Sequence, residues 1–155
     1  MFGLLTILFS FLLISVNPKS SYESARNAEK TTEIAIIWNA LNRWEVGSQD
    51  NKLENLLANG NKTKIPKCAD PLSSSSSYAL HITGGLTSES LNTEIDFSFL
   101  VDEGLLAELP KSPNYSPGLV KNQTGYFICK SKTNNDAYVI FTQGEPPNEW
   151  IKIER

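Results

Sequence analysis

The sequence is poor in the residues that build metal and redox sites. It contains two cysteines, one histidine and one methionine in 155 residues, which excludes a zinc site with three or four thiolate ligands. Positive charge is also scarce, because 14 Lys and Arg residues stand against 17 Asp and Glu residues and the net charge is −3. Without an excess of cations the chain has no broad surface for nucleic-acid phosphates. These shortages argue against a dedicated nucleic-acid binder.

Hydrophobic residues are not abundant enough for a membrane protein with several spans. Apolar residues make up 40% of the chain and charged residues 20%, which is also too apolar for a wholly disordered chain. The length fits a single domain, since domains typically contain ~100–200 residues. The position of the apolar residues therefore decides the class of protein.

The first sixteen residues, MFGLLTILFSFLLISV, contain no charged side chain. A transmembrane helix needs ~20 apolar residues and the core of a signal peptide ~7–15, so this run falls between the two, and a helix buried in a protein core is a third interpretation. We favour a retained membrane helix, because no basic residue precedes the run, Pro18 makes a poor cleavage context, and the hydrophobicity is uniform all round. The residues expected to face lipid are Phe2, Leu4, Leu5, Ile7, Leu8, Phe9, Phe11, Leu12, Leu13, Ile14 and Val16.

An amphipathic helix is expected to continue this segment. Pro18 removes a backbone donor and predicts a kink between the hydrophobic helix of residues 1–18 and its continuation over residues 19–45. Residues 20–32 are polar with small side chains, have little to bury, and are expected to lie against other helices. Apolar residues recur at steps of three and four in the second half, and we expect them to pack on a globular head. These head-packing residues are Ile34, Ile37, Trp38, Leu41 and Trp44.

Residues 46–155 are expected to form that head. Residues 45–66 are rich in polar and turn-forming residues and predict a loop, and the five serines at 73–77 predict a solvated link. Residues 95–105 fit either a strand or a short helix. The predicted fold class is α+β, with a long, membrane-anchored N-terminal helix packed on a small antiparallel β-sheet. The expected strands are residues 78–83, residues 126–129 and 138–141 as a hairpin, and residues 150–153 at an edge.

Few residues suggest chemistry. His81 lies in an alternating segment and is interpreted as a sheet residue, while Asp96, Asp102, Glu103 and Glu108 are interpreted as a solvated face. The sequence has no second histidine, no nucleophile elbow and no glycine-rich phosphate loop. We therefore expect no enzymatic activity, no cofactor and no metal site.

Two segments resemble type IV pilins and pseudopilins. In residues 17–41 an apolar helix passes a proline and reaches the element Ala25-Arg26-Asn27-Ala28-Glu29-Lys30, which is similar to the family's A-R-[DN]-A-x-[RK]. Further on, FLVDEGLLAELPKSP precedes GYFICKS and DAYVIF, and this order resembles the family's proline-containing turn before a tyrosine-rich hairpin. Together the resemblance covers most of residues 1–44 and 97–143. The residues that match in the turn are Gly104, Leu105, Leu106, Leu109, Pro110, Ser112 and Pro113.

The resemblance implies a structural subunit of a type IV pilus or pseudopilus that serves adhesion, motility or DNA uptake. It implies a single-pass protein of the bacterial inner membrane before assembly and an extracellular filament afterwards. The implied partners are copies of the chain, other pilins or pseudopilins and an inner-membrane assembly platform. The family's peptidase cleavage site and the glutamate that follows it are absent from this sequence, and we interpret Met1 as an internal methionine.

Two further functions stay open. One is a pseudopilin of a type II secretion system or a minor pilin, and the other is a membrane-anchored extracytoplasmic protein that acts as a monomeric binding protein or enzyme.

Outside the cytoplasm thiols tend to pair, so we expect a disulfide between Cys68 and Cys129, with two free buried cysteines as the alternative. The bridge would close a loop of about sixty residues, which the chain-entropy model values at ~4 kcal/mol.

Overall fold

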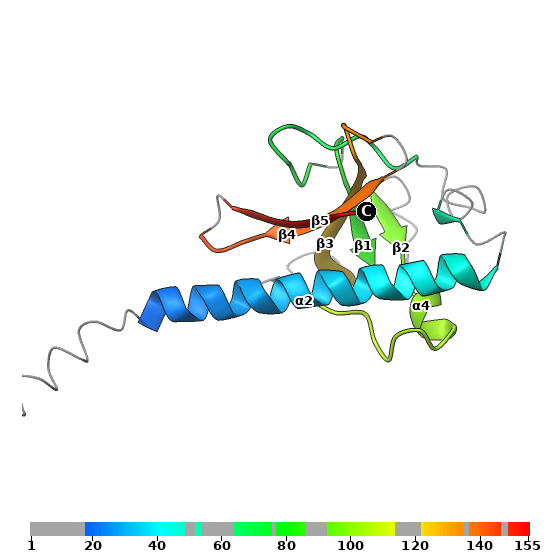
Figure 1. Cartoon of the computed structure of the whole chain (residues 1–155), viewed down its shortest axis with the longest axis horizontal. Coiled ribbons are helices and arrows are strands. Elements are labelled where there is room, and N and C mark those ends of the chain that lie inside the picture. Colours follow the sequence, from blue (N-terminus) through cyan, green and yellow to red (C-terminus); the bar gives the residue numbers. More distant parts are fainter. Residues whose placement is uncertain are drawn as a thin grey trace, which may run out of the picture.

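The computed structural model describes residues 18–48, 52–53, 64–75, 77–85, 93–113, 122–134, 137–146 and 149–155. In these residues one long helix, α2, runs across one face of a five-stranded sheet (Figure 1). The predicted membrane helix of residues 1–16 lies outside the described residues, and so does the junction upstream of Pro18 at which a kink is predicted. Among the helices that the structure describes, none is both long and apolar enough to cross a membrane.

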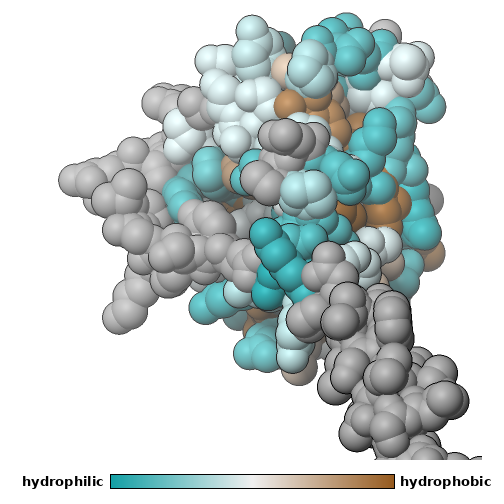
Figure 2. All heavy atoms as spheres, turned by 90° about the vertical axis from the view of Figure 1, so that its left-hand side faces the viewer, coloured by the Kyte–Doolittle hydropathy of each residue, from teal (hydrophilic) through white to brown (hydrophobic). Residues whose placement is uncertain are grey.

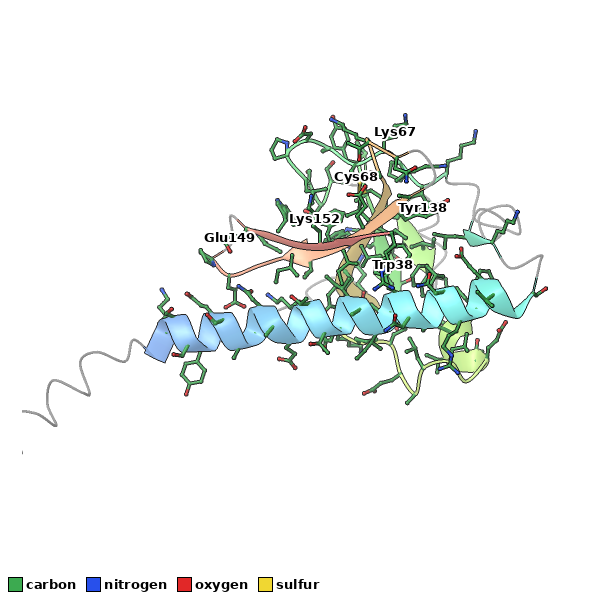
Figure 3. The ribbon with its side chains drawn as sticks, in the orientation of Figure 1. Trp38, Lys67, Cys68, Tyr138, Glu149 and Lys152 are labelled. Atoms are coloured by element: carbon green, nitrogen blue, oxygen red, sulfur yellow. A yellow bond between two sulfur atoms is a disulfide. The ribbon has the colours of Figure 1, made fainter. Side chains whose placement is uncertain are left out.

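Helix α2 spans Pro18–Gly47 and packs on the sheet through its second half. Residues three and four apart share a face of a helix, and this spacing brings the five apolar residues of the predicted head-packing face to the sheet. Figure 3 shows Trp38 between the helix and the strands, where its indole N–H donates to the carbonyl oxygen of Ile153 at 3.3 Å. All five are buried, with exposed fractions of 0% for Ile34, Ile37 and Leu41, 3% for Trp38 and 6% for Trp44.

The sheet has the strand order β2-β1-β3-β4-β5. Neighbouring strands are antiparallel except β1 and β2, which pair in parallel with Ile82 opposite Ile95. The expectation of an antiparallel sheet is therefore wrong at this edge. Alternation of apolar and polar residues indicates which face of a strand is buried but does not indicate its direction. The strands are β1 (Leu80–Thr83), β2 (Glu94–Asp96), β3 (Gln123–Lys130), β4 (Tyr138–Gln143) and β5 (Trp150–Glu154).

The segment that fits both a strand and a helix contains both. β2 ends at Asp96, whose side chain accepts a hydrogen bond from the backbone N–H of Ser98 at 2.8 Å, and the short helix α4 follows over Phe99–Asp102. Gly104 ends α4 with a φ of 69°, a left-handed conformation that glycine adopts without steric cost. The turn that resembles the pilin family therefore begins at a helix C-terminus.

Apolar residues pack on both faces of the sheet. Between α2 and the sheet lies the larger cluster, which includes Leu80, Ile128 and Ile140 as well as the helix residues. On the opposite face a smaller cluster contains Phe127 and Phe141, whose rings stack with centroids 5.5 Å apart. The sheet is thus buried on both sides, which explains why β3 has six consecutive buried residues.

The C-terminal segment forms the predicted edge strand and also contacts the helix. β5 pairs with β4 along its length and contacts α2. Ile151 and Ile153 pack partly buried against the main core. β5 thus pairs with β4 through its backbone and packs against the main core through its apolar side chains. The sequence of this segment alone does not show that both contacts form.

Candidate functional site

Helix α2 presents two different surfaces. The head-packing residues lie on one side, and on the other side five residues at steps of three and four form what we call the exposed stripe. In this stripe Tyr22 and Ile36 are 67% and 42% exposed. On the face of the molecule that Figure 2 shows, apolar residues appear in separate patches among hydrophilic ones. The exposed stripe consists of Tyr22, Ala25, Glu29, Thr32 and Ile36.

The polar half of α2 is held to the head by hydrogen bonds that end on the turn after β4. Arg26 donates to both carboxylate oxygens of Glu145, with Nε at 2.9 and 2.8 Å, and forms an ion pair with it. Asn27 and Glu145 exchange two bonds, because the Asn27 amide donates to the Glu145 carbonyl at 2.7 Å and accepts from the Glu145 N–H at 2.9 Å. Lys30 donates to the Gln143 carbonyl oxygen at 3.0 Å and to the Glu145 carboxylate at 3.2 Å. We call Arg26, Asn27, Lys30 and Glu145 the latch.

The latch corrects the expectation that residues 20–32 have little to bury. Lys30 is only 2% exposed, which is unusual for a lysine unless its charge is paired. The short ionic hydrogen bonds with Arg26 lower the pKa of Glu145, and Lys30 contributes to the same effect. The same contact raises the pKa of Arg26. The latch therefore keeps both partners charged.

A further polar contact follows one turn later. The hydroxyl of Tyr126, which is fully buried in β3, donates to the carboxylate of Glu33. Burial raises the pKa of both groups, and for Tyr126 the neighbouring carboxylate adds to this shift. Glu33 thus marks the place where the contacts of α2 change from polar to apolar.

A disulfide joins the two cysteines of the chain. Cys68 and Cys129 are bonded with an S–S distance of 2.03 Å and a sequence separation of 61. The backbone N–H of Cys68 also donates to the carbonyl oxygen of Lys130 at 2.9 Å, and the N–H of Lys130 donates to Pro66 at 2.8 Å. The bond and these backbone contacts tie the segment before β1 to the face of the sheet that is opposite α2.

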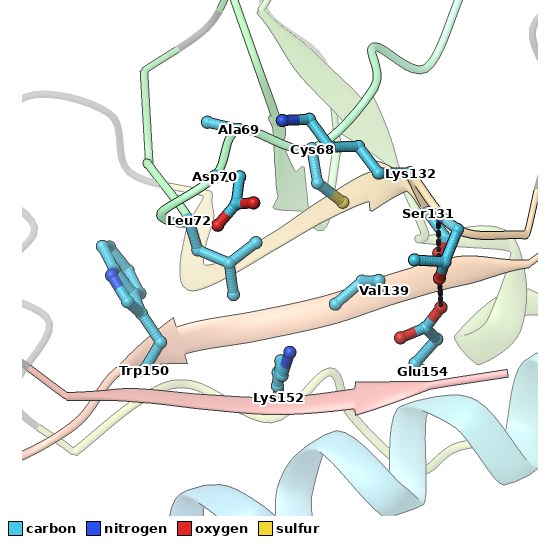
Figure 4. A pocket seen from close by; sticks show the side chains of 11 residues that line it. Cys68, Ala69, Asp70, Leu72, Ser131, Lys132, Val139, Trp150, Lys152 and Glu154 are labelled. Atoms are coloured by element: carbon cyan, nitrogen blue, oxygen red, sulfur yellow. Dashed lines mark hydrogen bonds between the residues drawn. The ribbon is translucent and has the colours of Figure 1, made fainter.

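A cavity of about 360 Å³ lies between this segment and the last two strands. Figure 4 shows Leu72 and Asp70 on one side, Lys152 on β5, and Trp150 at one end. Glu154 at the other end accepts a hydrogen bond from Ser131. Trp150 also lines a second cavity, of about 280 Å³. Both are open to solvent, and the first carries acidic and basic groups side by side.

His81, which is partly buried, and Glu94, which is buried, lie on neighbouring strands. They are direct partners in the parallel pairing of β1 and β2, and the His81 ring lies against Phe127 with centroids 4.5 Å apart. Burial lowers the pKa of His81, and the charge of Glu94 opposes this shift. In the part of the chain that the structure describes, no group of three or more His, Cys, Asp or Glu side chains is arranged to hold a metal ion.

Comparison with protein-family models, with curated proteins and with solved structures gives no match for this chain.

The structure brings together residues that the sequence does not connect. The sequence points to the two cysteines and to the head-packing residues, but not to the latch or the Glu33–Tyr126 contact. Glu145 is 119 positions from Arg26, and a single acidic residue in a turn gives no signal of its own. One hint was present, since Arg26, Asn27 and Lys30 belong to the element that resembles the pilin family.

Proposed function

We propose that this chain is a structural subunit of a surface filament of the type IV pilus or pseudopilus kind. The observation that carries the proposal is the two-sided character of α2. One side is buried on a small, disulfide-tied head, and the other leaves Tyr22 and Ile36 at the surface of the same long helix. A helix that exposes apolar side chains on this second side can pack on helices of other copies while it holds its own head.

In the proposed assembly, residues 1–16 hold the subunit in the bacterial inner membrane with the head outside. The segment then leaves lipid and docks among the helices of other subunits. Burial of apolar groups is worth ~0.8 kcal/mol per CH₂, so transfer to water is prohibitive and extraction has to be coupled to docking. Contacts that join copies head to tail without closing produce a filament. The partners are copies of this chain, other pilins or pseudopilins and an assembly platform in the membrane.

Electron microscopy of sheared surface appendages, combined with mass spectrometry, tests this proposal. The expected result is filaments that contain the tryptic peptide TTEIAIIWNALNR, residues 31–43. Replacing Ile36 by Asp on the exposed stripe should abolish filaments while the head stays folded. Asp102→Asn, at an exposed residue of α4, is the matched control and should assemble normally. Filaments without this peptide, or a mature chain that starts after residue 16, would overturn the proposal.

The cavity beside Trp150 favours the second candidate, a membrane-anchored monomeric binding protein. It offers an aromatic ring together with charged groups of both signs. This function predicts that small ligands raise the melting temperature of the full chain and that Trp150→Ala removes the effect. The filament proposal predicts no such dependence.

A further inference from the structure

The latch connects α2 to a turn of the head that a backbone hydrogen bond closes. Glu145 lies in the turn between β4 and β5, which is closed by a hydrogen bond from the N–H of Gly144 to the carbonyl oxygen of Glu149 at 2.7 Å. Asn27 pairs with both backbone groups of Glu145. This two-point contact restrains orientation as well as distance, because the Asn27 amide has to meet the N–H and the carbonyl oxygen of Glu145 at the same time.

The carboxylate of Glu145 adds a second fixed direction. The planar guanidinium of Arg26 binds it with more than one N–H, a geometry that is specific as well as strong. Lys30, one turn further along α2, reaches the same carboxylate from a buried position. Three side chains from two consecutive turns of the helix therefore converge on one residue of the head.

The position of the latch along the helix makes its geometry important. At 1.5 Å per residue, the twelve steps from Lys30 back to Pro18 span ~18 Å. A rotation of ~10° at the latch would move Pro18 by ~3 Å over this length. Protein interfaces are close-packed, so a displacement of this size would misalign the helices of neighbouring copies.

We propose that Glu145 is a positioning residue, which sets the direction of the polar half of α2 relative to the head and thereby permits assembly. The requirement for assembly rests on the proposed filament function, whereas the positioning does not. Glu145 acts through Arg26, Asn27 and Lys30.

Distances between two spin labels measure the positioning directly. The labels are attached to cysteines introduced at Lys19 on α2 and at Lys132 on the head, both of which are exposed, in the full chain in detergent. Glu145→Ala should broaden the distance distribution and shift it by ~3 Å or more. Glu149→Ala, in the same turn but outside the latch, should leave it unchanged. Arg26→Ala keeps the head turn intact and should give a smaller shift, which keeps the test usable if Glu145→Ala does not fold.

Filament counts on cells provide the second readout. Glu145→Ala should abolish filaments while Glu149→Ala assembles like the parent. An unchanged distance distribution in Glu145→Ala and Arg26→Ala would overturn the positioning role. A shifted distribution with a normal number of filaments would overturn the requirement for assembly. If the parent itself never forms filaments but the distribution shifts, the positioning role is supported and the proposed filament function fails.

Discussion

The two halves of α2 are attached to the head by different physics. Residues from Ile34 onward are held by burial of large apolar side chains, which is strong and tolerant of small shifts in angle. Residues up to Lys30 are held by ionic and amide hydrogen bonds to one turn, which are directional but weaker in water. The comparison teaches that the apolar half secures the helix to the head, while the polar half determines where its N-terminal end points.

The largest effect is expected from loss of the disulfide. It lies on the face of the sheet that is opposite α2, so its loss should affect the attachment of both halves of the helix equally. Replacing Cys68 and Cys129 by serine should lower the free energy of unfolding by ~4 kcal/mol according to the chain-entropy model for a loop of this length. Urea denaturation measures this difference. The parent and the variant should become indistinguishable under reducing conditions, and identical mobility of the parent on reducing and non-reducing gels would contradict the bond.

In the apolar half, Leu41→Ala should have the next largest effect. Leu41 is fully buried in the main core, and truncating such a residue typically costs ~2–5 kcal/mol because a cavity remains. Asn39→Ala on the exposed side of the same helix is the control and should change stability by less than ~0.5 kcal/mol. Equal effects of the two substitutions in thermal or chemical unfolding would mean that this face does not hold the helix.

At the boundary between the halves, Tyr126→Phe removes the hydroxyl that donates to Glu33. We expect a loss of ~1–3 kcal/mol, because a partly buried carboxylate then lacks its donor. Combining it with Glu33→Gln should recover much of this loss, since the uncharged amide is less costly to leave unpaired. The double-mutant cycle in urea measures the coupling. Additive effects would show that the contact contributes nothing to stability.

The smallest effects are those of pH on stability. The contributions of Glu145 and Glu33 should change with pH in opposite directions. The pKa of Glu145 is lowered, so its contribution to stability is present above the unfolded-state value and is lost as pH falls through the folded-state value. The pKa of Glu33 is raised, so its favourable contribution is present at low pH and is lost as pH rises through the folded-state value.

The two opposite pH dependences are separated by measuring the free energy of unfolding of Glu145→Gln and Glu33→Gln. The measurements run from about pH 3 to about pH 7, the range in which carboxylates titrate. Glu145→Gln should be less stable than the parent mainly at the neutral end. Glu33→Gln should be at least as stable as the parent there. A parent-like profile for both variants would remove the electrostatic difference between the two halves of the helix.

The sequence predicted the elements better than their partners. The periodicity of α2, the hairpin of β3 and β4 and the final edge strand were expected within a few residues of their observed bounds, because each depends on a pattern within one segment. The parallel pairing of β1 and β2 was not expected, and neither was the close packing of the C-terminal segment on the helix. Both depend on the direction in which the chain returns, which no local pattern records.

The sequence by itself determined which side of α2 is apolar, which cysteines were available for a bond and where strands and turns alternate, because these properties follow from side-chain chemistry at short spacing. Only the tertiary structure decided that Arg26, Asn27 and Lys30 meet Glu145 and that Glu33 meets Tyr126. Each of these contacts joins residues that are 93 or more positions apart. A polar side chain that will be buried has the same appearance in the sequence as one that stays in water, until the fold brings its partner to it.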